Sequence, residues 1–237
     1  RLNGLLSRMR TVLEREKTFT ADFSHEMRTP VAGLRSTLEV GLSRERTPTE
    51  YRELLKESLD MSLGLQSLTE TMLTLRRLES GATQPRATRF PVAELVAEVA
   101  ASLADAADGR GMTLKVTLEP DLVVFTDRAL LELAVRNLLG NAVAHGRSDG
   151  DILVCGNNSE DGVTLNFSNP CDHCSQEDAT ALRARFRRGD SSRSADDNHF
   201  GLGLALVDAI AQILGFQADI MVTDANVFVV RLLFSDS

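Results

Sequence analysis

Apolar residues recur every three or four positions along the first third of the chain, which is the spacing of helices with one apolar face. A first run extends from Leu2 to Phe23, and a cleaner heptad extends from Leu54 to Leu75. The polar, proline-containing segment at residues 46–49 interrupts the pattern between them. The pattern therefore predicts two helices in an antiparallel hairpin. A lone hairpin leaves one apolar stripe uncovered, so we expect two copies to form a dimeric four-helix bundle.

The periodicity changes after residues 81–85, where a glycine followed by a proline is typical of a helix end and a linker. Beyond this linker, short apolar or alternating runs typical of strands are interspersed with helical runs. We expect helices at residues 90–107, 127–145 and 201–214, and strands at 113–118, 122–125, 152–155, 163–167, 218–222 and 227–234. Helices and strands in this order predict an α/β sandwich of about 150 residues.

The composition is globular with an acidic balance, because the 237 residues include 26 Lys+Arg against 34 Asp+Glu, a net charge of −8. The acidic balance, the lack of tryptophan and the single tyrosine argue against nucleic acid as a direct partner. The longest apolar stretch, residues 200–207, is far shorter than the roughly 18 residues of a membrane span. Three cysteines do not form a disulfide framework, so a reducing compartment is expected.

The first chemical signal is the segment Phe-Ser-His-Glu-Met-Arg-Thr-Pro at residues 23–30. At about 100° per residue, His25 lies about 200° from the apolar stripe, so it faces solvent beside Glu26. An exposed imidazole next to a carboxylate is a nucleophile with a general base at hand, and a solvated surface histidine is the plainer alternative. Thr29 lies one turn further along the same face, and Pro30 is expected to bend the helix.

This segment closely resembles the H-box of the sensor histidine kinases of two-component systems. The resemblance implies that His25 accepts the γ-phosphate of ATP on a ring nitrogen and that Glu26 is the general base. It also implies that Thr29 positions water when the partner response regulator is dephosphorylated. Along the chain, it implies a signal-transducing helix at residues 1–17, a dimerisation and phosphotransfer hairpin at 18–81, and a catalytic ATP-binding domain with the Bergerat (GHKL) α/β sandwich fold at 88–237.

The second signal is a row of polar residues, Asn137, Asn141 and His145, at positions i, i+4 and i+8 of one predicted helix. Asparagine is a poor helix former, so the pair is either two surface amides or an amide oxygen offered to a divalent cation. The run Asn-Leu-Leu-Gly-Asn-Ala-Val-Ala-His resembles the N-box of the same kinases. That resemblance implies that Asn141 is the Mg²⁺ ligand, with Asn137 and His145 near the phosphates of ATP.

Glycines supply the third signal, since Gly-Leu-Gly-Leu opens a predicted helix after a charged, serine-rich stretch. Glycines allow close approach to phosphates, and a helix N-terminus favours anions. The run resembles the G2 box, which implies nucleotide contacts from Gly201, Leu202, Gly203 and Leu204. Upstream, Arg-Phe-Arg-Arg-Gly-Asp resembles the F-box and the start of an ATP lid, with Arg188 at the basic position, and a solvated loop is the alternative.

The adenine end departs from the family pattern, which is Asp-x-Gly-x-Gly after a strand. Asn169 stands at the position of the adenine-reading aspartate, and Cys171 and His173 replace the glycines. An amide oxygen still accepts a hydrogen bond from the adenine N6 amino group, but without charge assistance. We therefore expect nucleotide binding that is retained but weakened or altered.

A short cluster of cysteine and histidine follows Asn169 and has its own alternative interpretation. The run Cys-Asp-His-Cys ending at Cys174 is a candidate metal or thiol cluster, with Cys155 and His199 as further candidate ligands. Metal binding is disfavoured because the sequence contains no second pair at zinc-finger spacing, and incidental free thiols are the plainer interpretation.

Together the motifs favour the cytoplasmic portion of an inner-membrane sensor histidine kinase, whose membrane segment is expected upstream of residue 1. The expected cofactors are ATP and Mg²⁺, and the expected partners are a second copy of the chain and the receiver domain of a response regulator. One alternative is a dimeric scaffold or phosphatase that binds nucleotide poorly and acts through Thr29. A GHKL ATPase of the chaperone or topoisomerase kind is disfavoured by the H-box hairpin.

Overall fold

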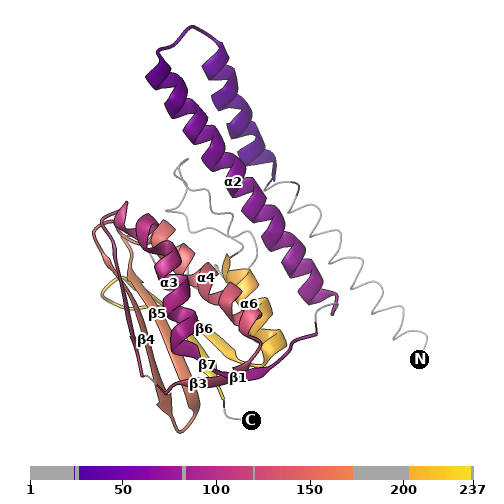
Figure 1. Ribbon diagram of the computed structural model, residues 1–237, viewed down its shortest axis with the longest axis vertical. Coiled ribbons are helices and arrows are strands. Elements are labelled where there is room, and N and C mark those ends of the chain that lie inside the picture. The colour runs from indigo at the N-terminus through magenta and orange to yellow at the C-terminus, as the bar shows by residue number, and fades with distance from the viewer. Residues whose placement is uncertain (1–23, 25–26, 82–83, 120, 173–202, 236–237) are drawn as a thin grey trace, which may run out of the picture. The chain divides into compact units, whose positions relative to one another are not determined.

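The computed structural model describes residues 24, 27–81, 84–119, 121–172 and 203–235 (Figure 1). The chain divides into two compact units, residues 1–69 and 70–237. The expected order, a helical hairpin followed by an α/β sandwich, is confirmed. Within the described ranges, no helix combines the length and the hydropathy needed to cross a bilayer.

The helical hairpin joins a first helix, described over residues 27–42, to α2 (Pro48–Glu79). A Cβ atom at Gly33 would lie 3.7 Å from Met61 Sδ, and one at Gly41 would lie 3.4 Å from Leu54 Cδ1. Residue numbers increase along the first helix while the numbers of their neighbours on α2 decrease, so the two helices are antiparallel. The heptad that contains Leu54 and Met61 faces the inside of the hairpin, as predicted.

The apolar stripe expected on the first helix is only partly correct. Met27 and Leu34 are half-buried, but Val31 and Leu38 are 47% and 45% exposed. Thr37 takes the buried position instead, and its hydroxyl donates to Glu57 Oε1 on α2 at 3.4 Å. The stripe is displaced because small residues at Gly33, Thr37 and Gly41 let the two helices approach closely.

A capping box fixes the turn between the two helices. The Thr47 hydroxyl accepts a hydrogen bond from the Glu50 N–H at 3.3 Å, and the Glu50 carboxylate accepts from the Thr47 N–H at 2.8 Å. Pro48 occupies the first helical position, where its missing N–H has no partner to lose. Arg46 Nη2 donates to the carbonyl of Val40 at 2.8 Å, which ties the end of the first helix to the same turn. A break is therefore confirmed, but it lies at residues 43–47 and not at 46–49, because α2 begins at Pro48.

Hydrogen bonds from the backbone and hydroxyl of Thr47, together with the nearby Arg44 guanidinium, lower the pKa of Glu50 below its ordinary value of 4.5. A carboxylate with a lowered folded-state pKa stabilises the fold above its unfolded pKa, and this contribution disappears as the pH falls through the folded pKa. We therefore expect Glu50→Gln to be less stable than the wild type at pH 7, with a difference that shrinks as the pH falls below about 4.

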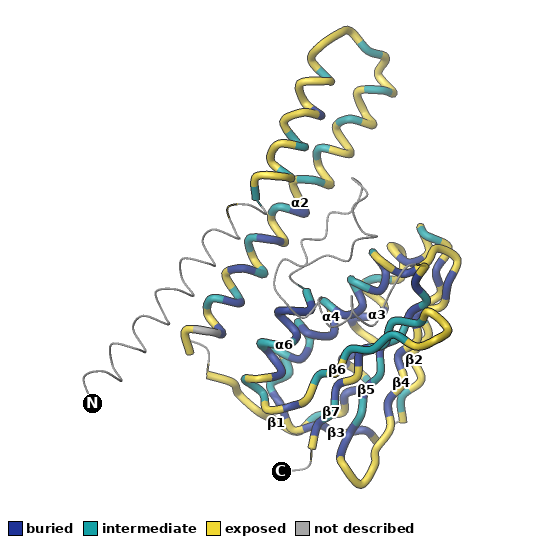
Figure 2. Tube along the Cα trace, turned by 180° about the vertical axis from the view of Figure 1, so that it is seen from behind, coloured by how far each residue is buried: buried dark blue, intermediate teal, exposed yellow. Residues whose placement is uncertain are grey.

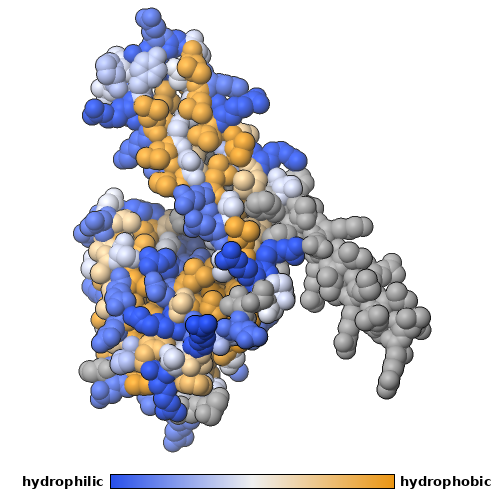
Figure 3. All heavy atoms as spheres, turned by 45° about the vertical axis from the view of Figure 1, so that its right-hand side comes forward, coloured by the Kyte–Doolittle hydropathy of each residue, from blue (hydrophilic) through white to orange (hydrophobic). Residues whose placement is uncertain are grey.

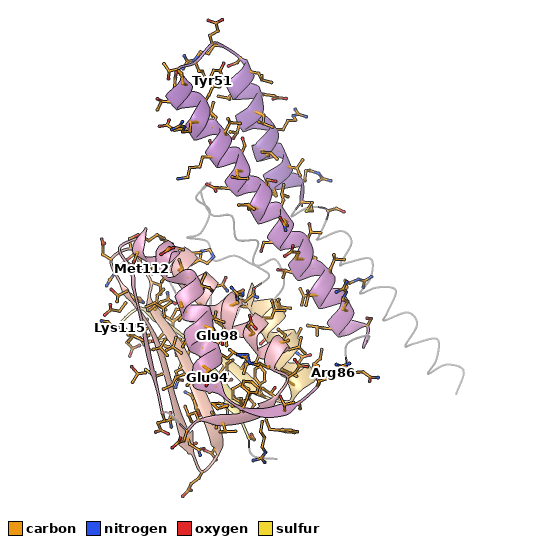
Figure 4. All side chains as sticks on the ribbon, in the orientation of Figure 1. Tyr51, Arg86, Glu94, Glu98, Met112 and Lys115 are labelled. Atoms are coloured by element: carbon orange, nitrogen blue, oxygen red, sulfur yellow. The ribbon has the colours of Figure 1, made fainter. Side chains whose placement is uncertain are left out.

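The adjacent Tyr51 provides the measurement for this prediction, because it is the single tyrosine in a chain without tryptophan (Figure 4). Its fluorescence during urea unfolding reports the turn selectively. Wild type and Glu50→Gln are compared at pH 7 and pH 3, and an equal gap between their unfolding midpoints at both pH values contradicts the expectation.

A five-stranded sheet with the order β2-β4-β5-β7-β6 forms the centre of the second unit. Its strands are β2 (Thr113–Leu118), β4 (Asp151–Ser159), β5 (Gly162–Pro170), β6 (Gln217–Val222) and β7 (Val227–Phe234). β2 and β4 are parallel, and the other neighbours are antiparallel. The helices on one face of this sheet are α3 (Val92–Asp108), α4 (Arg128–His145) and α6 (Gly203–Leu214) (Figure 1). A separate two-stranded sheet pairs β1 (Thr88–Pro91) with β3 (Val123–Thr126).

The core of this unit lies between the sheet and its helices (Figure 2). In β4 the side chains of Ile152 and Val154 are fully buried, while their neighbours along the strand are exposed. This alternation shows that one face of the sheet packs against the helices. The apolar stripe predicted on α4 is buried throughout, at Leu131, Ala134, Val135, Leu138 and Ala142.

The expected strands and helices of this unit are confirmed apart from small shifts at their ends, with one correction at the start. Phe90 was expected at the beginning of a helix, but it pairs with Val124 in the small sheet. α3 begins only after Pro91, whose backbone is extended. The reason is local, because a residue before proline is disfavoured in helical conformation.

Candidate functional site

α4 presents the polar row that the sequence singled out. The helix begins at its N-cap Asp127, whose carboxylate accepts from the Leu130 N–H at 3.1 Å. The buried apolar stripe fixes the rotation of the helix, so the polar row lies on another face. Asn137 and Asn141 are half-buried on that face, and His145 is exposed in the last turn.

Two asparagine amides converge on the first residue of α6. Asn137 Nδ2 donates to the carbonyl of Leu133 at 2.8 Å, which directs its Oδ1 away from its own backbone. A Cβ atom at Gly203 would lie 3.3 Å from Asn137 Oδ1, and 2.9 Å and 3.1 Å from Asn141 Nδ2 and Oδ1. The structure therefore brings together three residues that are 66 positions apart at most in the sequence. The space that the amides occupy exists because Gly203 has no side chain.

This arrangement suits an anion and a cation together. The first N–H groups of α6 have no partner within their helix, and they give this end a partial positive charge. Within the described residues, no hydrogen bond engages the Asn141 amide, so its oxygen is available to a hard cation such as Mg²⁺. The Leu204 side chain is only 8% exposed and belongs to the core. A contact from Leu204 to a nucleotide would therefore come from its backbone.

Asn169 lies inside β5, which extends to Pro170 and not only to residue 167 as expected. The longer strand is held by its pairing with β7, where Asn169 lies opposite Phe228. The Asn169 side chain is 6% exposed, and its Nδ2 donates to the carbonyl of Pro170 at 3.3 Å. Because its nitrogen is engaged in this way, Oδ1 remains as the acceptor. An acceptor is what the N6 amino group of adenine requires.

The cysteines correct the expectation that all three are free thiols. Cys171 is disulfide-bonded, whereas Cys155 is a free and exposed thiol. The Cys171 N–H donates to the carbonyl of Asn226 at 2.9 Å, which holds the start of this segment against the turn before β7. A sulfur in a disulfide is not a thiolate and is a poor metal ligand. Among the described residues, no group of three or more His, Cys, Asp or Glu side chains is placed to hold a metal ion.

Several predicted site residues lie outside the described residues: His25, Glu26, Arg188, Gly201 and Leu202, together with His173, Cys174 and His199. Thr29 is described, and it lies exposed on the first helix. The sequence pattern does not mark two further residues, Arg110 just after α3 and Gly146 at the end of α4. Nothing in their local sequence marks them, because Arg110 acts on carbonyl groups 33 to 36 positions away.

Comparison with known families decides what this arrangement belongs to. Residues 15–81 match the family described as "His Kinase A (phospho-acceptor) domain". Residues 126–235 match the family described as "Histidine kinase-, DNA gyrase B-, and HSP90-like ATPase". The chain belongs to the sensor histidine kinases. Its second domain is accordingly an ATP-binding domain, and its helical hairpin is a phospho-acceptor domain.

Individual sensor kinases resemble this histidine kinase along most of its length. Sensor protein CzcS of Cupriavidus metallidurans is 30% identical over 216 residues, and sensor protein kinase PmrB of Pseudomonas aeruginosa is 31% identical over 212. These matches cover 91% and 90% of this chain but 45% and 44% of the relatives, so the chain spans under half of their length. The histidine kinase AdeS of Acinetobacter baumannii shares the fold, with a TM-score of 0.70, 21% identity, and coverage of 89% of this chain and 97% of that chain.

Proposed function

We propose that this chain is the kinase core of a sensor protein, which transfers the γ-phosphate of ATP to His25 and then to an aspartate of a response regulator. The observation that carries the proposal is the convergence of the Asn137 and Asn141 amides on the backbone of Gly203. A phosphoryl-transfer site needs little more than positioning and charge neutralisation, and amide oxygens beside a helix N-terminus supply both.

The nucleotide is held from two ends in this proposal. Asn141 would hold Mg²⁺ through Oδ1, and the ion would supply neutralisation of charge on the phosphates. Asn169 Oδ1 accepts from the adenine amino group at the other end. The remaining contacts are proposed for Asn137, His145, Arg188, Gly201, Leu202, Gly203 and Leu204.

The phospho-acceptor is proposed on the hairpin. Glu26 takes the ring proton of His25 as the imidazole nitrogen attacks the γ-phosphorus and ADP leaves. Thr29, which is exposed on the first helix, positions water for dephosphorylation of the regulator. The domain boundaries proposed for these activities are residues 1–17, 18–81 and 88–237.

A homodimer follows from the outward surface of the hairpin. α2 exposes Leu55, Leu59 and Leu63 at steps of four residues, and the first helix of the same hairpin exposes Val31 and Leu38. Figure 3 shows an apolar stripe along one face of the hairpin. Because each exposed leucine is at least 54% accessible, a second copy that covers the stripe buries substantial apolar area. The relatives are sensor proteins about twice as long, which supports a parent protein anchored in the inner membrane with this portion in the cytoplasm.

The adenine contact is tested by Asn169→Asp. A charged acceptor forms a stronger hydrogen bond than a neutral amide, so we expect the variant to bind ADP about fivefold more tightly. Isothermal titration with ADP and Mg²⁺ measures the change, and Asn157→Asp on β4 is the control for added charge. Unchanged or weaker binding of the Asn169 variant contradicts the assignment of Asn169 to the base.

A second candidate function is a dimeric phosphatase or scaffold that acts through Thr29. Asn169 favours this second function, because an amide in place of the family's aspartate forms a weaker hydrogen bond to adenine. The two functions differ in one measurable respect: a kinase labels itself from ATP, whereas a phosphatase or scaffold only removes phosphate from the regulator or binds it.

A further inference from the structure

The Arg110 side chain donates hydrogen bonds to the backbone carbonyls at the C-terminal end of α4. It follows α3, is half-buried, and its Nη1 donates to the carbonyls of Val143 and Ala144. Its Nη2 donates to the carbonyl of Gly146 at 3.2 Å. The last carbonyls of a helix lack partners within the helix and carry a partial negative charge. A guanidinium with several donors in a fixed plane satisfies three of them at once.

The turn that Arg110 holds also contacts the segment that carries Asn169. A Cβ atom at Gly146 would lie 3.2 Å from Asn169 Nδ2, so the glycine backbone lies directly against the amide. The next residue, Arg147, donates its N–H to the carbonyl of Pro170 at 2.9 Å. The carbonyl of Pro170 is the same group that accepts the Asn169 amide. The end of α4 and the end of β5 are therefore linked by hydrogen bonds.

A third contact keeps this turn close to β2. Met112, labelled in Figure 4, is 1% exposed, and its Cε would lie 2.6 Å from a Cβ atom at Gly146. The carbonyl of Arg110 also accepts from the Asp149 N–H at 3.2 Å. Residues 110–112 thus hold the turn after α4 through both side-chain and backbone contacts.

We propose that Arg110 is a positioning residue for nucleotide binding, which sets the place of Asn169 by holding the α4 terminus and Gly146. The inference rests on the proposed function, since it concerns the base end of the same nucleotide site. Among the described residues, the Arg110 guanidinium donates hydrogen bonds to backbone carbonyls alone, so its effect on a nucleotide passes through the segment that it holds.

A double-mutant cycle separates positioning from general support of the fold. ADP affinity in the presence of Mg²⁺ is measured by calorimetry for the full chain, for Arg110→Met, for Asn169→Ala and for the double variant. All are measured well below their unfolding midpoints. Arg128→Met, which removes an arginine from the opposite end of α4, is the matched control. Arg110→Lys keeps the charge but not the planar fork, and it replaces Arg110→Met in the cycle if that variant does not fold.

We expect Arg110→Met to weaken ADP binding about tenfold in the wild-type background and less than about twofold in the Asn169→Ala background. Arg110→Lys should lie between wild type and Arg110→Met, and Arg128→Met should bind as the wild type does. Equal losses in both backgrounds, or no loss at all, overturn the positioning role while leaving the proposed function intact. Absence of ADP binding by the wild type overturns the proposed function and this inference with it.

Discussion

Gly203→Ala is expected to weaken Mg·ADP binding by about ten- to hundredfold while the chain folds normally. The new Cβ atom would meet the amides of Asn141 and Asn137 at 2.9 to 3.3 Å, which is closer than these groups tolerate without moving. The contacts are to the ends of side chains and not to backbone, so the amides rotate aside and the helix remains. Rotation removes the metal-ligating oxygen from its place, and the affinity falls.

The measurement is a calorimetric titration with ADP at fixed Mg²⁺, next to a thermal melt of each protein. Gly33→Ala is the control, because a Cβ atom there makes only ordinary contact with Met61 at 3.7 Å. The control should bind ADP as the wild type does. Binding by Gly203→Ala within about twofold of the wild type argues against a site between α4 and α6.

Gly162→Ala is expected to produce the largest loss of stability, about 3–5 kcal/mol. Gly162 begins β5 with φ of +117°, a backbone conformation that is strained for any residue with a Cβ atom. That atom would also lie 2.0 Å from the carbonyl oxygen of Phe234 on β7. The contact is to backbone where β5 begins and β7 ends, so relief requires moving the two strands apart at that end.

Gly215→Ala separates the two causes of this loss. Gly215 also has a positive φ, +77°, but nothing lies within 4 Å of a Cβ atom there. We expect it to lose only about 1 kcal/mol, from backbone strain alone. Urea unfolding followed by far-ultraviolet circular dichroism measures both variants. Equal losses for Gly162→Ala and Gly215→Ala would show that the clash with Phe234 does not matter.

Much of the fold was predictable because its signals are local. The heptad of α2 and the apolar stripe of α4 predicted their buried faces, and the polar segment at residues 46–49 predicted the turn. Each depends on neighbours within a few turns of the same chain segment. The stripe on the first helix failed at Val31 and Leu38, because glycines and Thr37, not large apolar residues, line the hairpin interior there.

The residues of the candidate site could be proposed from the sequence only where a motif marks them. Asn137, Asn141 and Gly203 are identified from the sequence by their resemblance to kinase motifs, and the fold then brings their atoms together. Arg110 and Gly146 could not be found in this way, because the role proposed for them comes from contacts between the turn after α3, the end of α4 and β5. The disulfide at Cys171 also escaped prediction, because three cysteines suggested free thiols. The contacts of Arg110 and Gly146 join segments that are far apart in the sequence, and no local pattern encodes them.

Autophosphorylation tests whether this chain is a working histidine kinase. The chain is incubated with γ-labelled ATP and Mg²⁺, alongside His25→Gln and Asn141→Ala, and each dimer is first shown to be folded. We expect a label that is labile in acid and stable in alkali, as a phosphoramidate is, and that is lost in both variants. A folded wild-type dimer that takes up no label at millimolar ATP, or label that persists in His25→Gln, would contradict it.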